Sequence, residues 1–236
     1  RRYLRRPDVI KPAISSACPA VTWLIEQRFP NLIENVIPLL PPVDVAARMA
    51  RKKALAEHPE LKSEDIGICF ISPCPAKVSY LKNEIAKGRS DVDCVVSMGD
   101  VYFSLVNIMS RAHEPEVSSE TGIIGVSWAS SGGEASALFN DRYLAADGIE
   151  NVIRVLHQIE NGNIPPVDFV ELNACPGGCV GGVLTIENPY VAKNRLHTLR
   201  RYMPVSLNRV PADGYIPGDS FVGEFPGYQP LNRLSD

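Results

Sequence analysis

Short apolar runs alternate with helical stretches along most of this chain, and that alternation constrains its fold more than any other feature. The run "IGICFIS" at residues 66–72 precedes a helical pattern at about 78–87, and "DCVVS" at 93–97 precedes another at about 100–111. Such runs are typical of strands buried on both faces, and strands that alternate with helices form parallel sheets. The sequence therefore predicts an α/β fold in which a parallel sheet is flanked by helices.

The N-terminal part of the chain adds further helices. Apolar residues recur at helical spacing over 21–35, and because Pro30 interrupts them the segment fits one kinked helix or two short ones. The alanine-rich stretch 43–58 follows a "PPVD" start signal and is predicted to be a helix. These helices are available to cover the predicted sheet.

The second half of the chain continues the pattern and then loses it. Helical segments to about residue 159 precede the predicted strand "VDFVEL" at 167–172 and a final helix at 189–202. Residues 204–236 are rich in proline and glycine and have no periodicity. We therefore expect one domain over residues 1–203 and an irregular C-terminal extension over 204–236.

The composition argues against several classes of protein. The chain has 236 residues, 45% of them hydrophobic, and a formal net charge of -3, so we expect a sizeable core and no nucleic-acid partner. We predict no membrane span and no signal peptide, and therefore a cytoplasmic location. Six cysteines are too few to build a disulfide scaffold of this length, which favours metal or cluster binding as their role.

Cysteines stand at three turns where a short apolar run gives way to a helix. Cys18 follows "AIS", Cys74 follows the predicted strand 66–72, and the motif "CPGGC" places Cys175 and Cys179 after the predicted strand 167–172. Open parallel sheets bind their ligands at the carboxyl ends of the strands. The sequence therefore predicts that these thiols gather at one edge of the sheet.

The residues around the thiols suit an anionic cluster. Proline after the cysteine favours the start of a helix, and the free amides of that first turn point toward a bound anion. Four cysteine thiolates hold a 4Fe-4S cluster, whereas structural zinc sites more often use paired Cys-x-x-Cys knuckles. The spacing favours an iron-sulfur cluster, and a zinc site or unrelated buried thiols remain the alternatives. Cys69 and Cys94, inside predicted strands, are interpreted as small buried hydrophobic side chains.

Three segments carry a resemblance to a known family. "SSACPAV", "SPCPAK" and "VELNACPGGCVGG" resemble, in order and separation, the three signature motifs of the catalytic domain of iron-only (FeFe) hydrogenases. The stretch "GVSWASSGGEASAL" is also similar to that family, and the likeness runs over about 14–203. In the family, four motif cysteines hold a 4Fe-4S cluster, and one of them bridges to a diiron site with carbon monoxide, cyanide and dithiolate ligands.

The resemblance implies roles for individual residues. Cys179 matches the bridging ligand, and Lys77 matches a lysine that binds a cyanide ligand, although without the motif we would interpret Lys77 as a solvated charge. Glu171 matches a glutamate that we expect to orient the third motif loop, whereas Glu134 is explained by capping of a helix. The residues that match the cluster ligands are Cys18, Cys74, Cys175 and Cys179.

The departures from the family pattern point to weak catalysis. Ala17 stands where catalytic members have a cysteine that donates protons, and a methyl group carries no exchangeable proton. The serine of the usual proton relay aligns near Ile37, and Ser72 and Asn173 replace two methionines that flank the site. These changes resemble the sensory branch of the family.

The resemblance therefore implies an iron-sulfur redox domain that interconverts hydrogen with protons and electrons, either slowly or as a sensor. The implied partners are ferredoxin or electron-transfer iron-sulfur domains, maturation proteins that insert the diiron group, and signalling domains. We expect a first lobe to lie ahead of Arg1 in the parent protein, and this chain to be inactive alone. A non-catalytic 4Fe-4S protein of the cluster-assembly type and a zinc-stabilised interaction domain are the competing interpretations.

Overall fold

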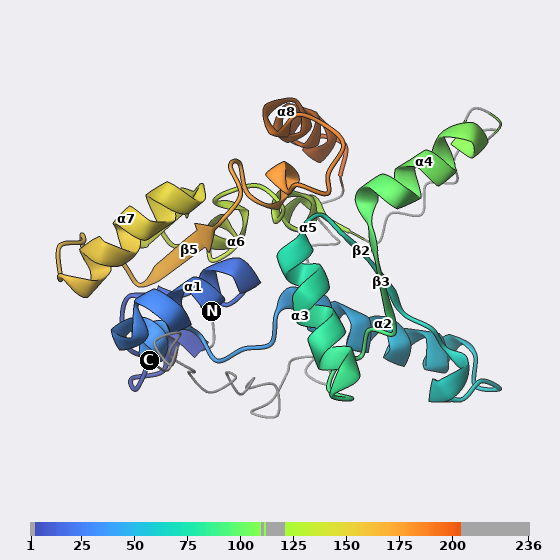
Figure 1. Ribbon diagram of the computed structural model, residues 1–236, viewed down its shortest axis with the longest axis horizontal. Coiled ribbons are helices and arrows are strands. Elements are labelled where there is room, and N and C mark those ends of the chain that lie inside the picture. The colour runs from blue at the N-terminus through green and yellow to red at the C-terminus, as the bar shows by residue number, and fades with distance from the viewer. Residues whose placement is uncertain (1–2, 110, 112–120, 204–236) are drawn as a thin grey trace, which may run out of the picture.

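The computed structural model describes residues 3–109, 111 and 121–203 (Figure 1). The predicted C-terminal extension over 204–236 lies outside the described residues. None of the helices in these described ranges is long and apolar enough to cross a membrane.

The strands are parallel, as predicted, and they form two sheets. The larger sheet has the order β1 (Ala13–Ile14), β5 (Phe169–Asn173), β4 (Tyr143–Asp147), so that β5 lies in the middle. The smaller sheet pairs β2 (Cys69–Ser72) with β3 (Cys94–Ser97). The predicted α/β class is confirmed, and the chain divides its strands between two small sheets instead of one.

Helices α1 (Pro19–Arg28) and α7 (Ile149–Glu160) pack together on one face of the larger sheet. A 3-10 helix over Pro30–Asn35 follows α1, so the proline separates two short helices, one of the two forms predicted. The buried side chains that join these elements include Ile14, Val21, Ile25, Phe29, Val152, Leu156, Val170 and Leu172. This is the main hydrophobic core among the described residues.

Helices α2 (Pro42–Glu57) and α3 (Pro75–Ala86) cover one face of the smaller sheet. Phe70 and Val95 point into this interface, where Leu81 is fully buried. On the opposite face Cys69 and Cys94 are exposed, and so is Ile71. The prediction that the run at residues 66–72, which forms β2, is buried on both faces is therefore wrong, because α2 and α3 cover only one side of the sheet. The interpretation of Cys69 and Cys94 as buried hydrophobic side chains is wrong for the same reason.

The remaining elements include two longer helices and several short ones. α4 (Met98–Met109) follows β3 and α8 (Pro189–Arg200) follows the third cysteine turn, and both are predicted helices that are confirmed. The shorter elements are α5 (Ile123–Ser127), α6 (Gly133–Ser136) and 3-10 turns at Tyr3–Arg5, Ser63–Asp65 and Cys179–Gly181.

The strand β4 corrects a sequence-based expectation. Its residues, "YLAAD", lie within a stretch that we predicted to be helical up to about residue 159. Alanine favours helices, but pairing along the whole length of β5 holds this segment extended. Gly148, at φ 81°, then turns the chain into α7.

Candidate iron-sulfur site

Two of the four motif cysteines occupy the same local position. Cys18 is the residue that precedes α1 and Cys74 the residue that precedes α3, and each is followed by proline in the first helical turn. The backbone N–H of Lys77 donates to the Cys74 sulfur at 3.4 Å. The Cys-Pro dipeptides therefore place both cysteines at helix starts, as the sequence predicts, and the thiol of Cys74, unlike that of Cys18, accepts from an amide of the first turn.

The third cysteine turn depends on glycine. Gly178 has φ 94°, and a Cβ atom there would lie 2.5 Å from the Ser131 nitrogen and 2.8 Å from the Ala129 oxygen. The Asp147 carboxylate accepts a 2.6 Å hydrogen bond from the Gly177 N–H. A side chain at Gly178 has no room, so the turn between the two cysteines requires glycine.

The second and third cysteine turns also bind each other directly. The Leu184 N–H donates to the Pro73 carbonyl at 3.0 Å, and a Cβ atom on Gly182 would collide with that same carbonyl oxygen. Cys74 and Cys179, which are far apart in sequence, are thereby held in neighbouring loops.

A half-buried cation joins the two loops. The Lys77 ammonium lies 3.5 Å from the Cys179 sulfur. Burial by itself lowers the pKa of Lys77, but the sulfurs of Cys179, Cys74 and Cys18 outweigh burial and the net pKa is raised. Interpretation of Lys77 as a solvated surface charge does not fit this position.

The thiols of the motif cysteines influence one another. The pKa of Cys175 is raised to about 11, mainly by burial and in addition by Cys74, Cys18 and Cys179. The pKa of Cys179 is also raised by burial, although Lys77 lowers it in part. The structure thus brings all four predicted ligands to one place, where an added cation would be needed to keep them ionised together.

The candidate donor set consists of four thiols, which both a zinc ion and an iron-sulfur cluster can bind. In the described ranges, no three His, Cys, Asp or Glu side chains are gathered closely enough to hold one metal ion. A zinc ion draws its thiolates to about 2.3 Å from a single centre, whereas a 4Fe-4S cluster takes one thiolate at each of several irons. The number and kind of these donors fit a 4Fe-4S cluster.

A cavity of about 1090 Å³ opens beside Cys179 and Lys77. It lies between β2, α4, α5 and α8, and Ala17 lines it where a proton-donating cysteine would stand in catalytic members of the resembling family. Phe70, Trp128 and Leu196 contribute apolar walls. The cavity provides room for a second group next to Cys179.

Two glutamates, Glu171 and Glu134, line the cavity, and their hydrogen-bond partners differ. Glu171 is buried, and its carboxylate accepts hydrogen bonds from the N–H groups of Gly132 and Ala135 at 2.9 and 2.8 Å and from Asn173 at 2.8 Å. These hydrogen bonds connect β5 to the loop that carries Gly132 and Gly133, which fits an orienting role for Glu171.

Two other positions that depart from the family pattern are buried. Ile37, where the relay serine would align, lies in the core, and Ser72 is fully buried.

Glu134 is the residue that sequence analysis interpreted incompletely. Its carboxylate accepts a 2.6 Å hydrogen bond from Ser15, and burial raises its pKa to about 7. Capping of the short helix α6 does not account for this contact. No local signal reveals it, because the two residues are separated by most of the chain.

Comparisons with known proteins identify a family and a fold for this chain. The family model described as "Iron only hydrogenase large subunit, C-terminal domain" matches residues 2–141 and 134–183. Among solved structures, an [FeFe]-hydrogenase studied for oxygen inactivation has a TM-score of 0.63 at 16% identity, with 96% of this chain and 77% of that chain covered. A variant of HydA1 from Chlamydomonas reinhardtii has a TM-score of 0.59 at 18% identity, with 78% and 65% covered.

A curated relative has a different described role. The probable cytosolic Fe-S cluster assembly factor oxy-4 of Caenorhabditis elegans is 22% identical, with 75% of this chain and 49% of the relative covered. The chain thus spans about half the length of that relative. The structural matches establish the fold, and the family model covers most of the chain. This chain belongs to the family of the iron-only hydrogenase large subunit, C-terminal domain.

Proposed function

We propose that this chain is a hydrogenase-like iron-sulfur redox domain that holds a 4Fe-4S cluster on Cys18, Cys74, Cys175 and Cys179. The observation that carries the proposal is that these four thiols and the half-buried Lys77 lie close enough to shift one another's pKa values. When bound, the cluster supplies a one-electron redox centre. The helix-start amides at Cys74 and the Lys77 ammonium would both favour its negative charge.

We further propose that the cavity beside Cys179 accepts a diiron group, with Cys179 as the shared ligand and Lys77 directed at an anionic ligand of that group. Such a group supplies the chemistry by which hydrogen and protons interconvert. The residues of this chain hold it and exclude water through the apolar walls. Glu134 carries a proton for part of the time at neutral pH, whereas Ala17 carries none. Turnover is therefore expected to be slow, which suits a sensory role.

Cluster assembly is a second candidate function, and the Caenorhabditis elegans relative favours it. A protein of that type needs the four cysteines but no cavity for a diiron group. The position of Lys77 and the volume beside Cys179 favour the first candidate. We place the protein in the cytoplasm, in keeping with the word "cytosolic" in the description of that relative. The proposed partners are a ferredoxin-like donor, maturation proteins and signalling domains.

Anaerobic reconstitution with iron and sulfide tests the cluster. We expect about four irons and four sulfides per chain and an electron paramagnetic resonance signal on reduction. Cys175→Ser should lose most of both, while Cys94→Ser, which removes a thiol outside the site, should retain them. One tightly bound zinc per chain with no cluster would overturn the proposal in favour of a zinc-stabilised domain.

Co-expression with hydrogenase maturation proteins separates the two candidate functions. A diiron group carries carbon monoxide and cyanide, which absorb in a region of the infrared where proteins do not. Such bands, weakened in Lys77→Met, would support the hydrogenase type. A fully loaded 4Fe-4S chain without them would favour the assembly type.

A further inference from the structure

Two cysteines outside the proposed cluster site face each other across the smaller sheet. Cys69 and Cys94 are direct register partners in the parallel pair β2 and β3, and both are exposed. The Cys94 side chain is the main cause that raises the pKa of Cys69, as expected for two neighbouring thiols. Packing does not explain them, because the helices α2 and α3 cover the other face of this sheet.

The pair is separate from the four motif cysteines. Cys69 and Cys94 are the first residues of their strands, whereas Cys74 follows the last residue of β2. The strands are parallel, so the pair lies at the N-terminal end of both strands and Cys74 lies beyond the C-terminal end of β2. The proposed cluster therefore makes no use of either thiol.

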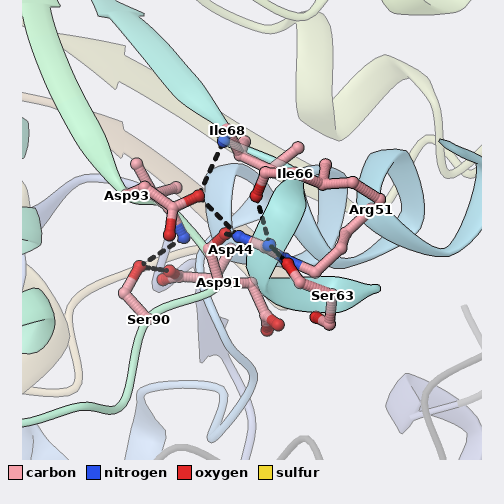
Figure 2. Close-up of polar contacts among 9 residues, drawn as sticks. Asp44, Arg51, Ser63, Ile66, Ile68, Ser90, Asp91 and Asp93 are labelled. Atoms are coloured by element: carbon pink, nitrogen blue, oxygen red, sulfur yellow. Dashed lines mark hydrogen bonds and ion pairs between the residues drawn. The ribbon is translucent and has the colours of Figure 1, made fainter. Parts of the chain in front are cut away.

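A polar network fixes the register that aligns the two thiols. The Asp93 carboxylate accepts a 2.6 Å hydrogen bond from the Ile68 N–H, and the Asp93 N–H donates to the Ile68 carbonyl at 2.8 Å (Figure 2). Arg51 on α2 binds the Asp93 carboxylate and the Ile66 carbonyl, both at 2.5 Å. Ile68 and Asp93 immediately precede the two cysteines, so this network holds the start of both strands in place.

The spacing of the strands suits a disulfide. Partner residues of neighbouring strands have Cα atoms separated by about 4.8 Å, and disulfides join Cα atoms about 4.4 to 6.8 Å apart. Exposure gives small oxidants access to both sulfurs. We propose that Cys69 and Cys94 form a reversible redox site, which a small disulfide such as oxidised glutathione converts to an intramolecular disulfide.

The reaction balances as a thiol-disulfide exchange. One protein thiolate attacks the small disulfide, forms a mixed disulfide and displaces one small thiolate. The second protein thiolate then attacks the protein sulfur of the mixed disulfide and displaces the other small thiolate. Two electrons pass from the cysteine pair to the small disulfide, and the two protons go to the released thiols.

The consequence is a covalent link within a weak element. A sheet of two strands has little stability by itself, and β2 leads directly into the loop that carries Cys74. Oxidation would close a chain loop between the two strands and stabilise the folded form by restricting the unfolded chain. The redox state of the pair would thus affect the stability of the lobe that presents Cys74, by which we mean the smaller sheet with α2 and α3.

Thiol mapping tests the proposal on the intact chain. The reduced chain is equilibrated anaerobically with mixtures of reduced and oxidised glutathione, quenched with an alkylating agent and mapped by mass spectrometry. We expect a Cys69–Cys94 linked peptide that is two hydrogens lighter than the reduced pair and that disappears on reduction. The melting temperature of the intact chain should rise on oxidation by roughly 5 to 10 °C.

Single variants supply the controls. Cys94→Ser should stop at a mixed disulfide on Cys69, with one glutathionyl group added and no rise in melting temperature, and Cys69→Ser should behave reciprocally. The inference is wrong if the wild-type chain shows both cysteines alkylated in excess oxidised glutathione, or carries a glutathionyl group on each of them. Linkage of either one to a motif cysteine would equally overturn it. None of these outcomes depends on whether the motif cysteines hold a cluster.

Discussion

At the scale of single residues, the site combines acidic, basic and sulfur groups whose ordinary charges are altered by burial. Lys77, Cys179 and Glu134 all line the same cavity. Burial shifts the pKa of each of them, and the charge of Lys77 acts on both Cys179 and Glu134, so replacing Lys77 is expected to change the titration of both.

Lys77→Met should make Cys179 less reactive in the chain without cluster. The ammonium lowers the pKa of Cys179, so its loss raises that pKa and leaves less thiolate at neutral pH. We expect alkylation of Cys179 to slow severalfold at pH 8, as measured by mass spectrometry of the labelled peptide. Lys82→Met, which removes an exposed lysine from the same helix, is the control. Equal rates in all three chains would show that Lys77 has no electrostatic effect on this thiol.

Glu134→Gln should flatten the dependence of stability on pH. The folded pKa of Glu134 is about 7 and the ordinary value is 4.5, so the folded state binds more protons between these values and loses stability as pH rises through them. The wild-type chain should lose on the order of 3 kcal/mol relative to the variant between pH 4 and pH 8, at about 1.4 kcal/mol per unit. Urea unfolding of the chain without cluster measures this.

Glu34→Gln, which replaces an exposed glutamate, should retain the wild-type dependence on pH. If the Glu134→Gln chain follows the wild-type curve over the whole range, the buried carboxyl is not the cause of the dependence.

At the scale of elements, turns rather than strands position the sulfurs. The two Cys-Pro turns are fixed by the helix starts that follow them, and the third turn is fixed by glycine backbone that no other residue can adopt without strain. The turns are therefore the parts of the fold in which small substitutions should have large effects on the site.

Gly178→Ala should destabilise the chain and reduce cluster loading. The new Cβ would both occupy a positive φ and collide with the backbone at Ser131 and Ala129, which together should cost on the order of 2 to 4 kcal/mol. Gly162→Ala is a matched control, because Gly162 has φ 65° but nothing within 4 Å of the added Cβ. It should lose about 1 kcal/mol and bind iron normally. Similar losses in the two variants would mean that strain, and not the collision, explains the effect.

At the scale of the whole molecule, the site joins the two sheets. Cys18 and Cys175 follow strands of the larger sheet and Cys74 follows a strand of the smaller one. A cluster bound by all of them would link the lobe of the smaller sheet to the lobe formed by the larger sheet with α1 and α7. The contact between α1 and α3 already joins these two lobes.

Cluster loading should therefore raise the melting temperature of both lobes together. A group that binds only the folded chain stabilises it, and four thiolate ligands on two lobes make that effect global. We expect the reconstituted chain to unfold in a single transition at a higher temperature. Calorimetry under anaerobic conditions measures this transition. Cys74→Ser should abolish the rise. Two separate transitions, with only one of them shifted by iron, would contradict a site shared between the lobes.

Hydrogen evolution by the purified chain should be undetectable or very slow, even after diiron loading. Ala17 offers no proton beside the cavity, and a positioned proton donor contributes about 100-fold to 10,000-fold in rate. Ala17→Cys in the loaded protein should raise the rate by a factor in this range, as measured by gas chromatography with a reduced viologen donor. Robust evolution by the unaltered chain would show that another group supplies the proton.

Much of this protein was predictable from local sequence. The helices that follow Cys18, Cys74 and the third turn are predictable because proline, glycine and apolar periodicity act over a few residues. That Cys18 and Cys175 lie near each other was also predictable, because both follow parallel strands of one sheet. Cys74 follows a strand of the other sheet, so the prediction that all the thiols lie at one sheet was wrong, and only the tertiary structure brings Cys74 to the others. The order and spacing of the three motifs sufficed to suggest the family.

Only the tertiary structure decided which strands pair and which faces stay open. Pairing with β5 keeps β4 extended despite its alanines, and one-sided covering by α2 and α3 leaves Cys69 and Cys94 exposed in register. The contact between Ser15 and Glu134 and its effect on the pKa of that glutamate likewise join distant segments. Propensity and periodicity describe neighbours along the chain, whereas burial and charge depend on neighbours in space, and for these residues the two sets differ.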